Sequence, residues 1–221
     1  PMFTDVSLYS TTPVEQSLWT AKTIAAGLCR TPNWIVDANA CIGGNTWSFA
    51  QLAMTTAIEL EPVHVRALQY NLDLIAKSDI RPAMHKIDIL EGNCVPVLRE
   101  LMNPRSKPPE FYASIDSNEP SDNKSKIPDV VFVDPPWGGI DYKKEKNIIL
   151  SYRYERDHIQ LHSLLAELKP VEMLVAKLPY NYNFETLTSL RRYSKIVHAI
   201  DPRDQPLYSL VLMSDNQIGP I

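Results

Sequence analysis

The sequence predicts an α/β fold in which a largely parallel sheet carries helices on both faces. Along its 221 residues, 44% of them apolar, short apolar runs alternate with amphipathic stretches and no internal repeat is found. This length suits one domain with a single core. Several apolar runs end in an acidic residue. Ligands of such sheets bind at the carboxyl ends of the strands, so these acidic residues are the first candidates for a site.

The expected elements follow from the spacing of apolar residues. We expect seven strands, at residues 34–38, 55–60, 83–87, 129–133, 173–178, 196–200 and 207–213. We expect six helices, at residues 14–28, 46–54, 62–75, 95–102, 154–168 and 184–191. The last two strands are joined by a short loop, which permits antiparallel pairing.

The composition excludes several classes of protein. No run of eighteen apolar residues occurs, so we expect no membrane span. The first ten residues lack the basic region and apolar core of a secretory signal. Cys29, Cys41 and Cys94 are widely separated and odd in number, which argues against a disulfide framework or a zinc knuckle. We therefore expect an intracellular protein, nuclear or cytoplasmic, that binds no metal.

The charge distribution limits how nucleic acid could be bound. The net charge is −4 and the pI about 5.7, whereas proteins that grip long nucleic acids usually carry a basic face. Recognition of a single base or of a chain end fits this balance better. There are two local basic clusters, at Lys143, Lys144 and Lys146 and at Arg191, Arg192 and Lys195. We interpret each as a solvated face in preference to a phosphate site.

The first candidate site is the turn after the first predicted strand. Asp37 ends that strand, and Gly43 and Gly44 follow just before a helix. Adjacent glycines allow a ligand close to the backbone, and the helix N-terminus favours a carboxylate. The spacing differs from the dinucleotide fingerprint, which needs three glycines. A tight turn without a ligand remains the alternative.

Two further acidic residues extend this site. Glu59 ends the second predicted strand and could accept both hydroxyls of a ribose; alternatively it favours the start of the next helix. Asp88 ends the third predicted strand and could accept a hydrogen bond from an adenine amino group; alternatively it is a loop or capping acid. With the glycine turn, these positions describe a nucleoside carrying an amino acid, which is S-adenosylmethionine.

The most specific motif is DPPWGG at Asp134–Gly139, directly after the fourth predicted strand. Two consecutive prolines stiffen the backbone and remove two amide donors, which leaves carbonyl acceptors for an amino-group substrate. Asp134 adds a carboxylate acceptor, and Trp137 offers a flat face on which a base can stack. A rigid turn with a core tryptophan is the structural alternative.

These motifs resemble a known family. Asp134–Trp137 is similar to the Asp/Asn-Pro-Pro-aromatic motif of amino-group methyltransferases that act on adenine or guanine. The longer stretch Pro135–Tyr142 resembles the trimethylguanosine synthase family of RNA cap guanine-N2 methyltransferases. Segments that match this family in the same order are Tyr9–Pro13, Val36–Ala38, Gly43–Thr46, Ile58–Pro62 and Leu178–Asn181.

The resemblance implies a Rossmann-like class I methyltransferase with a seven-stranded, mostly parallel sheet and a terminal antiparallel strand. We expect residues 1–30 to form an N-terminal helical segment that covers the active site, and residues 31–221 to form the S-adenosylmethionine-dependent methyltransferase domain. Residues 103–128 are rich in Pro, Ser, Asn, Asp and Lys and predict a flexible surface insertion.

The resemblance also assigns the site residues. Cofactor binding falls to Thr12, Asp37, Ala38, Gly43, Asn45, Thr46, Glu59, Leu60, Asp88, Ile89 and Asp134. The reacting amino group falls to Asp134, Pro135 and Trp137. Other substrate contacts fall to Ser10, Trp137, Gly138, Lys177, Tyr180 and Asn181. The expected substrate is a 7-methylguanosine-capped RNA or a cap nucleotide, methylated at N2 to di- or trimethylguanosine by a monomer of cellular or viral source.

Three positions depart from the family pattern. The family usually has serine where Asp134 stands and glycine where Cys41 stands. Its arginine after Leu-Pro is here Tyr180, so Lys177 becomes the candidate for contact with a phosphate. An adenine-N6 methyltransferase, for which Asp134 is the usual residue, is the nearest alternative function. A cap-binding module without catalysis is the second.

Overall fold

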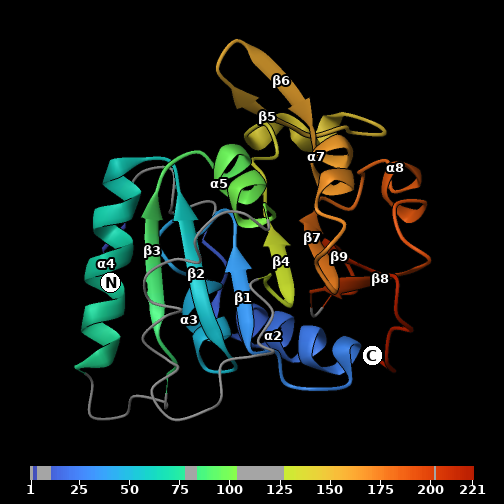
Figure 1. Cartoon of the computed structure of the whole chain (residues 1–221). Helices are drawn as coiled ribbons and strands as arrows, with labels where there is room; N and C mark the ends of the chain where they lie inside the picture. Colours follow the sequence, from blue (N-terminus) through green and yellow to red (C-terminus); the bar gives the residue numbers. More distant parts are fainter. Residues whose placement is uncertain (1, 4–10, 78–83, 104–126, 202) are drawn as a thin grey trace.

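A seven-stranded sheet forms the centre of the molecule (Figure 1). The computed structural model describes residues 2–3, 11–77, 84–103, 127–201 and 203–221. The strands are β1 (Trp34–Asp37), β2 (Met54–Glu59), β3 (Ile87–Glu91), β4 (Val130–Val133), β7 (Met173–Leu178), β8 (Tyr193–Ile200) and β9 (Pro206–Ser214). Their order is β3-β2-β1-β4-β7-β9-β8, and β9 runs antiparallel to both neighbours. The mostly parallel sheet with a terminal antiparallel strand is confirmed.

Helices pack on both faces of this sheet, as predicted. On one face, α5 (Cys94–Leu101), α7 (Leu161–Glu167) and α8 (Glu185–Thr188) share a cluster of buried apolar side chains with the strands. On the other face lie α2 (Val14–Leu28), α3 (Thr46–Ala50) and α4 (Pro62–Ala76). Neighbouring strand residues serve opposite faces, since Val36 joins the first cluster and Ile35 the second. None of the helices in the described ranges is long and apolar enough to cross a membrane.

The segment predicted as one helix at residues 154–168 is instead a hairpin followed by a short helix. β5 (Ser151–Tyr154) and β6 (Asp157–Gln160) pair antiparallel, and only then does α7 begin. Tyr152 and Ile159 face each other in the ladder and both pack against the core, which is the alternation of a strand pair. Glu155 reverses the chain with φ +56°. Figure 1 shows this hairpin projecting beyond the carboxyl ends of the parallel strands.

The third strand lies four residues later than predicted. β3 covers Ile87–Glu91, not residues 83–87. Ile87 and Ile89 pack against the α4 side of the sheet and Leu90 against the opposite cluster, so the packing of these three partly buried side chains fixes the position of the strand. Asp88 pairs with Thr56 inside the strand and does not end it. The helices predicted at 46–54 and 184–191 also end early, at Ala50 and Thr188.

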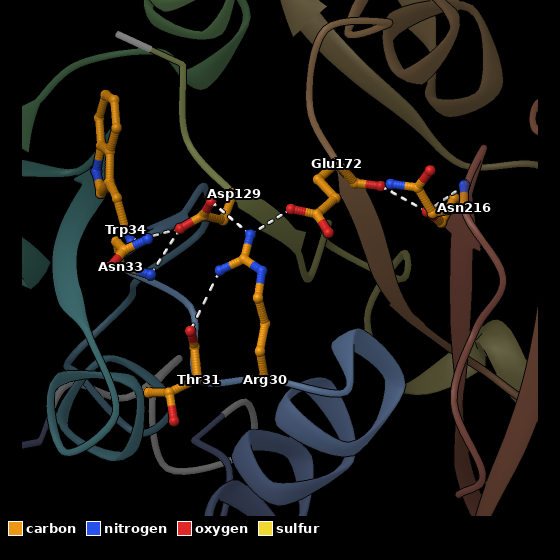
Figure 2. A network of polar contacts seen from close by, with 8 residues as sticks. Arg30, Thr31, Asn33, Trp34, Asp129, Glu172 and Asn216 are labelled. Carbon is orange, nitrogen blue, oxygen red and sulfur yellow. Dashed lines mark hydrogen bonds and ion pairs between the residues drawn. The ribbon is translucent and has the colours of Figure 1, made fainter. Parts of the chain in front are cut away.

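The amino ends of β1, β4 and β7 are tied together by an ionic network (Figure 2). Asp129, just before β4, accepts hydrogen bonds from the backbone amides of Asn33 (2.6 Å) and Trp34 (3.1 Å). Its other oxygen accepts from the Arg30 guanidinium at 2.8 Å. Arg30 also pairs with Glu172, whose backbone oxygen accepts from the Ser214 hydroxyl. One acidic residue thus joins the end of α2 to the start of three strands.

Asp129→Ala is expected to lower the free energy of unfolding by about 2 kcal/mol, because two backbone amides lose their acceptor and Arg30 loses one of its two carboxylate partners. Urea denaturation monitored by circular dichroism measures the change. Asp73→Ala, an exposed position on α4, is the control and should alter stability by no more than about 0.5 kcal/mol. Equal effects of the two substitutions would show that the Asp129 network does not stabilise the fold.

Candidate functional site

The parallel strands bring most of the predicted residues to one edge of the sheet. Asp37 is the last residue of β1 and Glu59 the last of β2. Asp134 follows β4 directly, and Lys177 is the penultimate residue of β7. β1 lies between β2 and β4, and β4 between β1 and β7. The acidic residue of the glycine turn and the DPPW motif are therefore neighbours.

The glycine turn packs against the segment that precedes α2. A Cβ on Gly44 would lie 3.0 Å from the backbone oxygen and 3.1 Å from the backbone nitrogen of Thr12. The backbone that approaches Gly44 closely is therefore that of Thr12. The sequence had suggested that a ligand would take this place. Gly43 has φ +99°, where a side chain would be strained. Asn45 extends the contact, since its Nδ2 donates to the Thr12 hydroxyl at 3.1 Å.

Asp37 is fully buried at the start of this turn. Its Oδ2 accepts a hydrogen bond from the Thr46 hydroxyl at 2.8 Å. Its Oδ1 is buried and has no hydrogen-bond partner within the described residues. Burial raises the pKa of Asp37 to about 7; the Thr46 hydrogen bond opposes the rise, and the nearby charges of Asp134 and Glu59 add to it. An unpaired buried carboxylate oxygen is a place for a cationic donor.

A second buried acceptor lies on the same turn. The side-chain oxygen of Asn45 has no partner among the residues that the structure describes. With Asp37 Oδ1, it makes two carbonyl-type oxygens that can accept hydrogen bonds from an ammonium group. The donor set thus fits the amino-acid part of S-adenosylmethionine. Ala38 and Thr46 lie on this turn too, and both are buried.

Glu59 holds the turn in shape. Its two carboxylate oxygens accept hydrogen bonds from the backbone amides of Cys41 and Glu61, both at 2.8 Å. The His64 ring nitrogen lies 3.5 Å from it. Each carboxylate oxygen can accept a second hydrogen bond, so contact with ribose hydroxyls stays a prediction. Leu60 beside it is 53% exposed.

The end of β3 carries other residues than those we expected. The prediction that Asp88 ends the strand is wrong, because the chain continues to Glu91 before it turns. Ile89 packs against the α4 side of the sheet. Asn93 follows the strand end; its Oδ1 caps α5 through the amide of Val95 and its Nδ2 donates to the backbone oxygen of Arg153. Burial raises the pKa of Asp88, and Lys86 lowers it.

The DPPW turn is anchored at its first residue. Asp134 Oδ2 accepts a hydrogen bond from the Lys177 ammonium at 2.7 Å, and its amide donates to Asn39 Oδ1 at 3.2 Å. The Tyr152 hydroxyl donates to the same Asn39 oxygen at 2.7 Å. Burial raises the pKa of Asp134, and the charge and hydrogen bond of Lys177 oppose that rise. The sequence analysis did not identify Asn39 or Tyr152 as site residues. Tyr152 belonged to no predicted element, so its sequence position gave no indication that it reaches the site.

Trp137 lies partly buried beyond the two prolines. Its ring meets Tyr142 edge-on, with centroids 5.2 Å apart and planes at 77°. Its indole nitrogen is buried without an acceptor in the described ranges. Gly138 has φ +90° and nothing lies within 4 Å of the Cβ it lacks, so the backbone shape, not crowding, favours glycine there. The indole packs against the buried clusters of both faces of the sheet, and part of its surface stays accessible.

The remaining predicted substrate residues have different positions. The Lys177 ammonium points inward, where it donates to the Thr12 hydroxyl at 2.8 Å as well as to Asp134. We expected Lys177 to contact a phosphate, and this geometry gives that expectation no support. Tyr180 is 39% exposed. Asn181 donates to the backbone oxygens of Tyr142 and Glu145 and so holds η1 (Ile140–Lys144) beside Trp137. Ser10 and most of the predicted insertion at residues 103–128 lie outside the described residues.

No group of three or more His, Cys, Asp or Glu side chains suited to a metal ion occurs in the described part of the chain.

Comparison with known proteins identifies the family to which the chain is similar. The model of a family described as RNA cap guanine-N2 methyltransferase matches residues 32–205. A trimethylguanosine synthase from Schizosaccharomyces pombe is 26% identical over 136 residues, which are 62% of this chain and 46% of that protein. An uncharacterized protein, L320, from Acanthamoeba polyphaga mimivirus is 28% identical over 152 residues, 68% of this chain and 48% of that protein. The chain spans about half the length of these relatives.

Solved structures share the fold. A protein from Porphyromonas gingivalis described as a methyltransferase superposes with a TM-score of 0.60 at 18% identity, over 98% of this chain and 44% of that one. A precorrin 8w decarboxylase from Methanobacterium thermoautotrophicum gives 0.54 at 15% identity, over 96% of each chain. The fold is thus the Rossmann-like class I methyltransferase fold, as the sequence predicted.

Asp37→Asn is expected to flatten the pH dependence of stability. The folded protein retains a proton on Asp37 between the ordinary pKa of 3.8 and about 7, whereas the unfolded chain releases it. The free energy of unfolding of the wild type therefore falls as the pH rises through this range, by up to about 1.4 kcal/mol per pH unit. Urea denaturation of both proteins without ligand, at several pH values across the range, compares the slopes. Asp73→Asn is the control and should keep the wild-type slope; a wild-type slope in Asp37→Asn would show that Asp37 titrates normally.

Proposed function

This chain belongs to the RNA cap guanine-N2 methyltransferase family, and we propose that it transfers methyl groups from S-adenosylmethionine to the exocyclic N2 of a 7-methylguanosine cap, giving di- or trimethylguanosine. One observation carries the proposal. The Asp134–Trp137 turn, rich in acceptors and carrying an aromatic face, stands beside the buried, unpaired oxygens of Asp37 and Asn45. An amino-group acceptor site and an ammonium site thus share one edge of the sheet.

On this proposal, Asp37 and Asn45 accept hydrogen bonds from the amino group of the cofactor's methionine part, and Glu59 accepts from its ribose. S-adenosylmethionine, when bound, supplies a methyl group already activated on a sulfonium. Since Thr12 packs on Gly44 and bonds Asn45, the segment before α2 fixes this turn. That contact supports the expectation that the N-terminal helical segment lies over the active site.

The substrate base is held by stacking and by fixed acceptors. 7-Methylguanine is a delocalised cation, and a cation over an indole face gains up to about 2 kcal/mol when desolvated. Trp137 is therefore the residue expected to bind it. Pro135 and Pro136 have no amide N–H, so this part of the turn offers only acceptors to the amino group. Asp134 and the carbonyl groups of the turn orient the amino group and stabilise the positive charge that develops on its nitrogen.

An adenine-N6 amino group is the second candidate substrate, because Asp134 replaces the serine that the family usually has there. Adenine is uncharged at neutral pH and gains stacking energy without the cationic contribution. Binding of a cationic and of an uncharged base therefore separates the two functions. Capped RNA or a cap nucleotide is the partner proposed for the first function.

Trp137→Ala is expected to weaken binding of 7-methylguanosine diphosphate by about 5- to 150-fold, as the loss of one base stack of about 1–3 kcal/mol implies. Isothermal titration calorimetry in the presence of S-adenosylhomocysteine measures it. Trp137→Phe keeps a smaller aromatic face, so its affinity should lie between those of the wild type and Trp137→Ala. Binding of S-adenosylhomocysteine itself should stay near the wild-type value.

The same titration tests the choice of base. The wild type should bind 7-methylguanosine diphosphate more tightly than guanosine diphosphate or adenosine diphosphate. Tightest binding of the adenine nucleotide would favour the second function, and parallel loss of both ligands in Trp137→Ala would count against stacking.

A further inference from the structure

Lys177 is a lysine where the fold leaves almost no access to water. It lies in β7, only 6% exposed. Val133 in β4 pairs with Ala176 in β7. The residues that follow them, Asp134 and Lys177, therefore lie side by side at the ends of these parallel strands. The ammonium lies 2.7 Å from Asp134 Oδ2 and 2.8 Å from the Thr12 hydroxyl. A buried cation is tolerated because both contacts satisfy it.

Aromatic rings complete the surroundings of this ammonium. It lies 5.7 Å from the centroid of the Trp137 ring and 5.0 Å from that of Tyr208. Two of its three N–H groups bond Asp134 and Thr12, and the ring faces are close enough for attraction of the cation. Lys177 thus contacts the DPPW turn, β9 and the segment before α2.

The ion pair leaves half of the Asp134 carboxylate for another partner. Oδ2 is bonded to Lys177, whereas no hydrogen bond to Oδ1 forms within the described residues. We infer that Lys177 is a positioning residue for methyl transfer: it keeps the Asp134 carboxylate charged and oriented so that Oδ1 accepts a hydrogen bond from the substrate amino group. This inference rests on the proposed function, since it assigns a task to the same site.

The other groups that face Asp134 cannot replace Lys177. Asp37 on β1 is acidic, and its charge and that of Asp134 disfavour each other. Tyr152 on β5 and Tyr208 on β9 are neutral phenols whose pKa values are raised by burial and by the charge of Asp134. Without Lys177 the carboxylate would face a neutral or acidic surrounding. Its pKa would rise further, which favours the protonated carboxyl group over the carboxylate.

The first test compares Lys177→Met with Lys177→Arg. In Lys177→Met we expect the rate of methyl transfer at neutral pH to fall by about 100-fold, with the KM for S-adenosylmethionine nearly unchanged. The acid limb of the pH–rate profile should move to higher pH, so that part of the activity returns in alkaline solution. Lys177→Arg retains the positive charge and should restore the wild-type acid limb. Lys22→Met, an exposed position on α2, should behave as the wild type.

A role in stability alone would give a different result. If Lys177 only supports the fold, the activity of Lys177→Met would fall by the same factor at every pH, and Lys177→Arg would show no selective rescue; this outcome overturns the inference. Should Lys177→Met not fold, the uncharged pair Asp134→Asn with Lys177→Gln keeps the hydrogen bond. It should fold, bind the cofactor and lose the acid limb, and an unchanged acid limb in this variant overturns the inference as well.

The rates are measured with both a cap nucleotide and an adenine nucleotide, so that failure of the proposed function is separable. Methyl transfer to adenine alone would reject the proposed substrate while leaving the test of Lys177 intact on that substrate. If neither nucleotide is methylated, the pH dependence of the unfolding midpoint tests whether Lys177 keeps Asp134 charged. Lys177→Met should then lose stability as the pH rises, more steeply than the wild type, because the pKa of its Asp134 would rise further once Lys177 no longer lowers it. Equal slopes would contradict the inference.

Discussion

The buried ion pair between Lys177 and Asp134 is the interaction on which the geometry of the site depends. It joins the ends of β4 and β7, and through Thr12 it reaches the segment before α2 and Asn45 of the glycine turn. Asn39 adds a second tie, from the Asp134 amide to Tyr152 of the projecting hairpin. Five stretches distant in sequence are therefore held at one edge. Buried pairs of this kind cost desolvation, and their use here is better explained by positioning than by stability.

The two ends of the parallel strands have different tasks. At the amino ends, Arg30, Asp129 and Glu172 join α2 to β1, β4 and β7 with every carboxylate oxygen of Asp129 in a hydrogen bond. At the carboxyl ends, carboxylate and amide oxygens stay buried and unpaired among the described residues. Paired groups stabilise the first end, whereas unpaired acceptors at the second leave hydrogen bonds for a ligand.

Much of this architecture could be predicted, because buried parallel strands such as 173–178 are continuous apolar runs and α2 shows regular helical spacing. The prediction failed where burial depends on tertiary partners. Asp88 was placed at a strand end because its acidic side chain looked like a terminus, yet packing of Ile87 and Ile89 on α4 sets the strand later. The helix predicted at 154–168 wrongly includes β6 and the last residue of β5, because the alternation of the hairpin covers only a few residues. The inward direction of Lys177 has no sequence signal at all, because it depends on Asp134 and Thr12 from other elements.

Transfer of a methyl group to a purine amino nitrogen is the central claim, and mass spectrometry of the product tests it most directly. The protein is incubated with 7-methylguanosine diphosphate and, in parallel, with adenosine diphosphate, each with S-adenosylmethionine carrying a deuterated methyl group, and fragmentation locates the label. The account predicts one or two labelled methyl groups on N2 of the guanine. A guanine that stays unlabelled while an adenine nucleotide gains the label at N6, or a label on ribose, would contradict it.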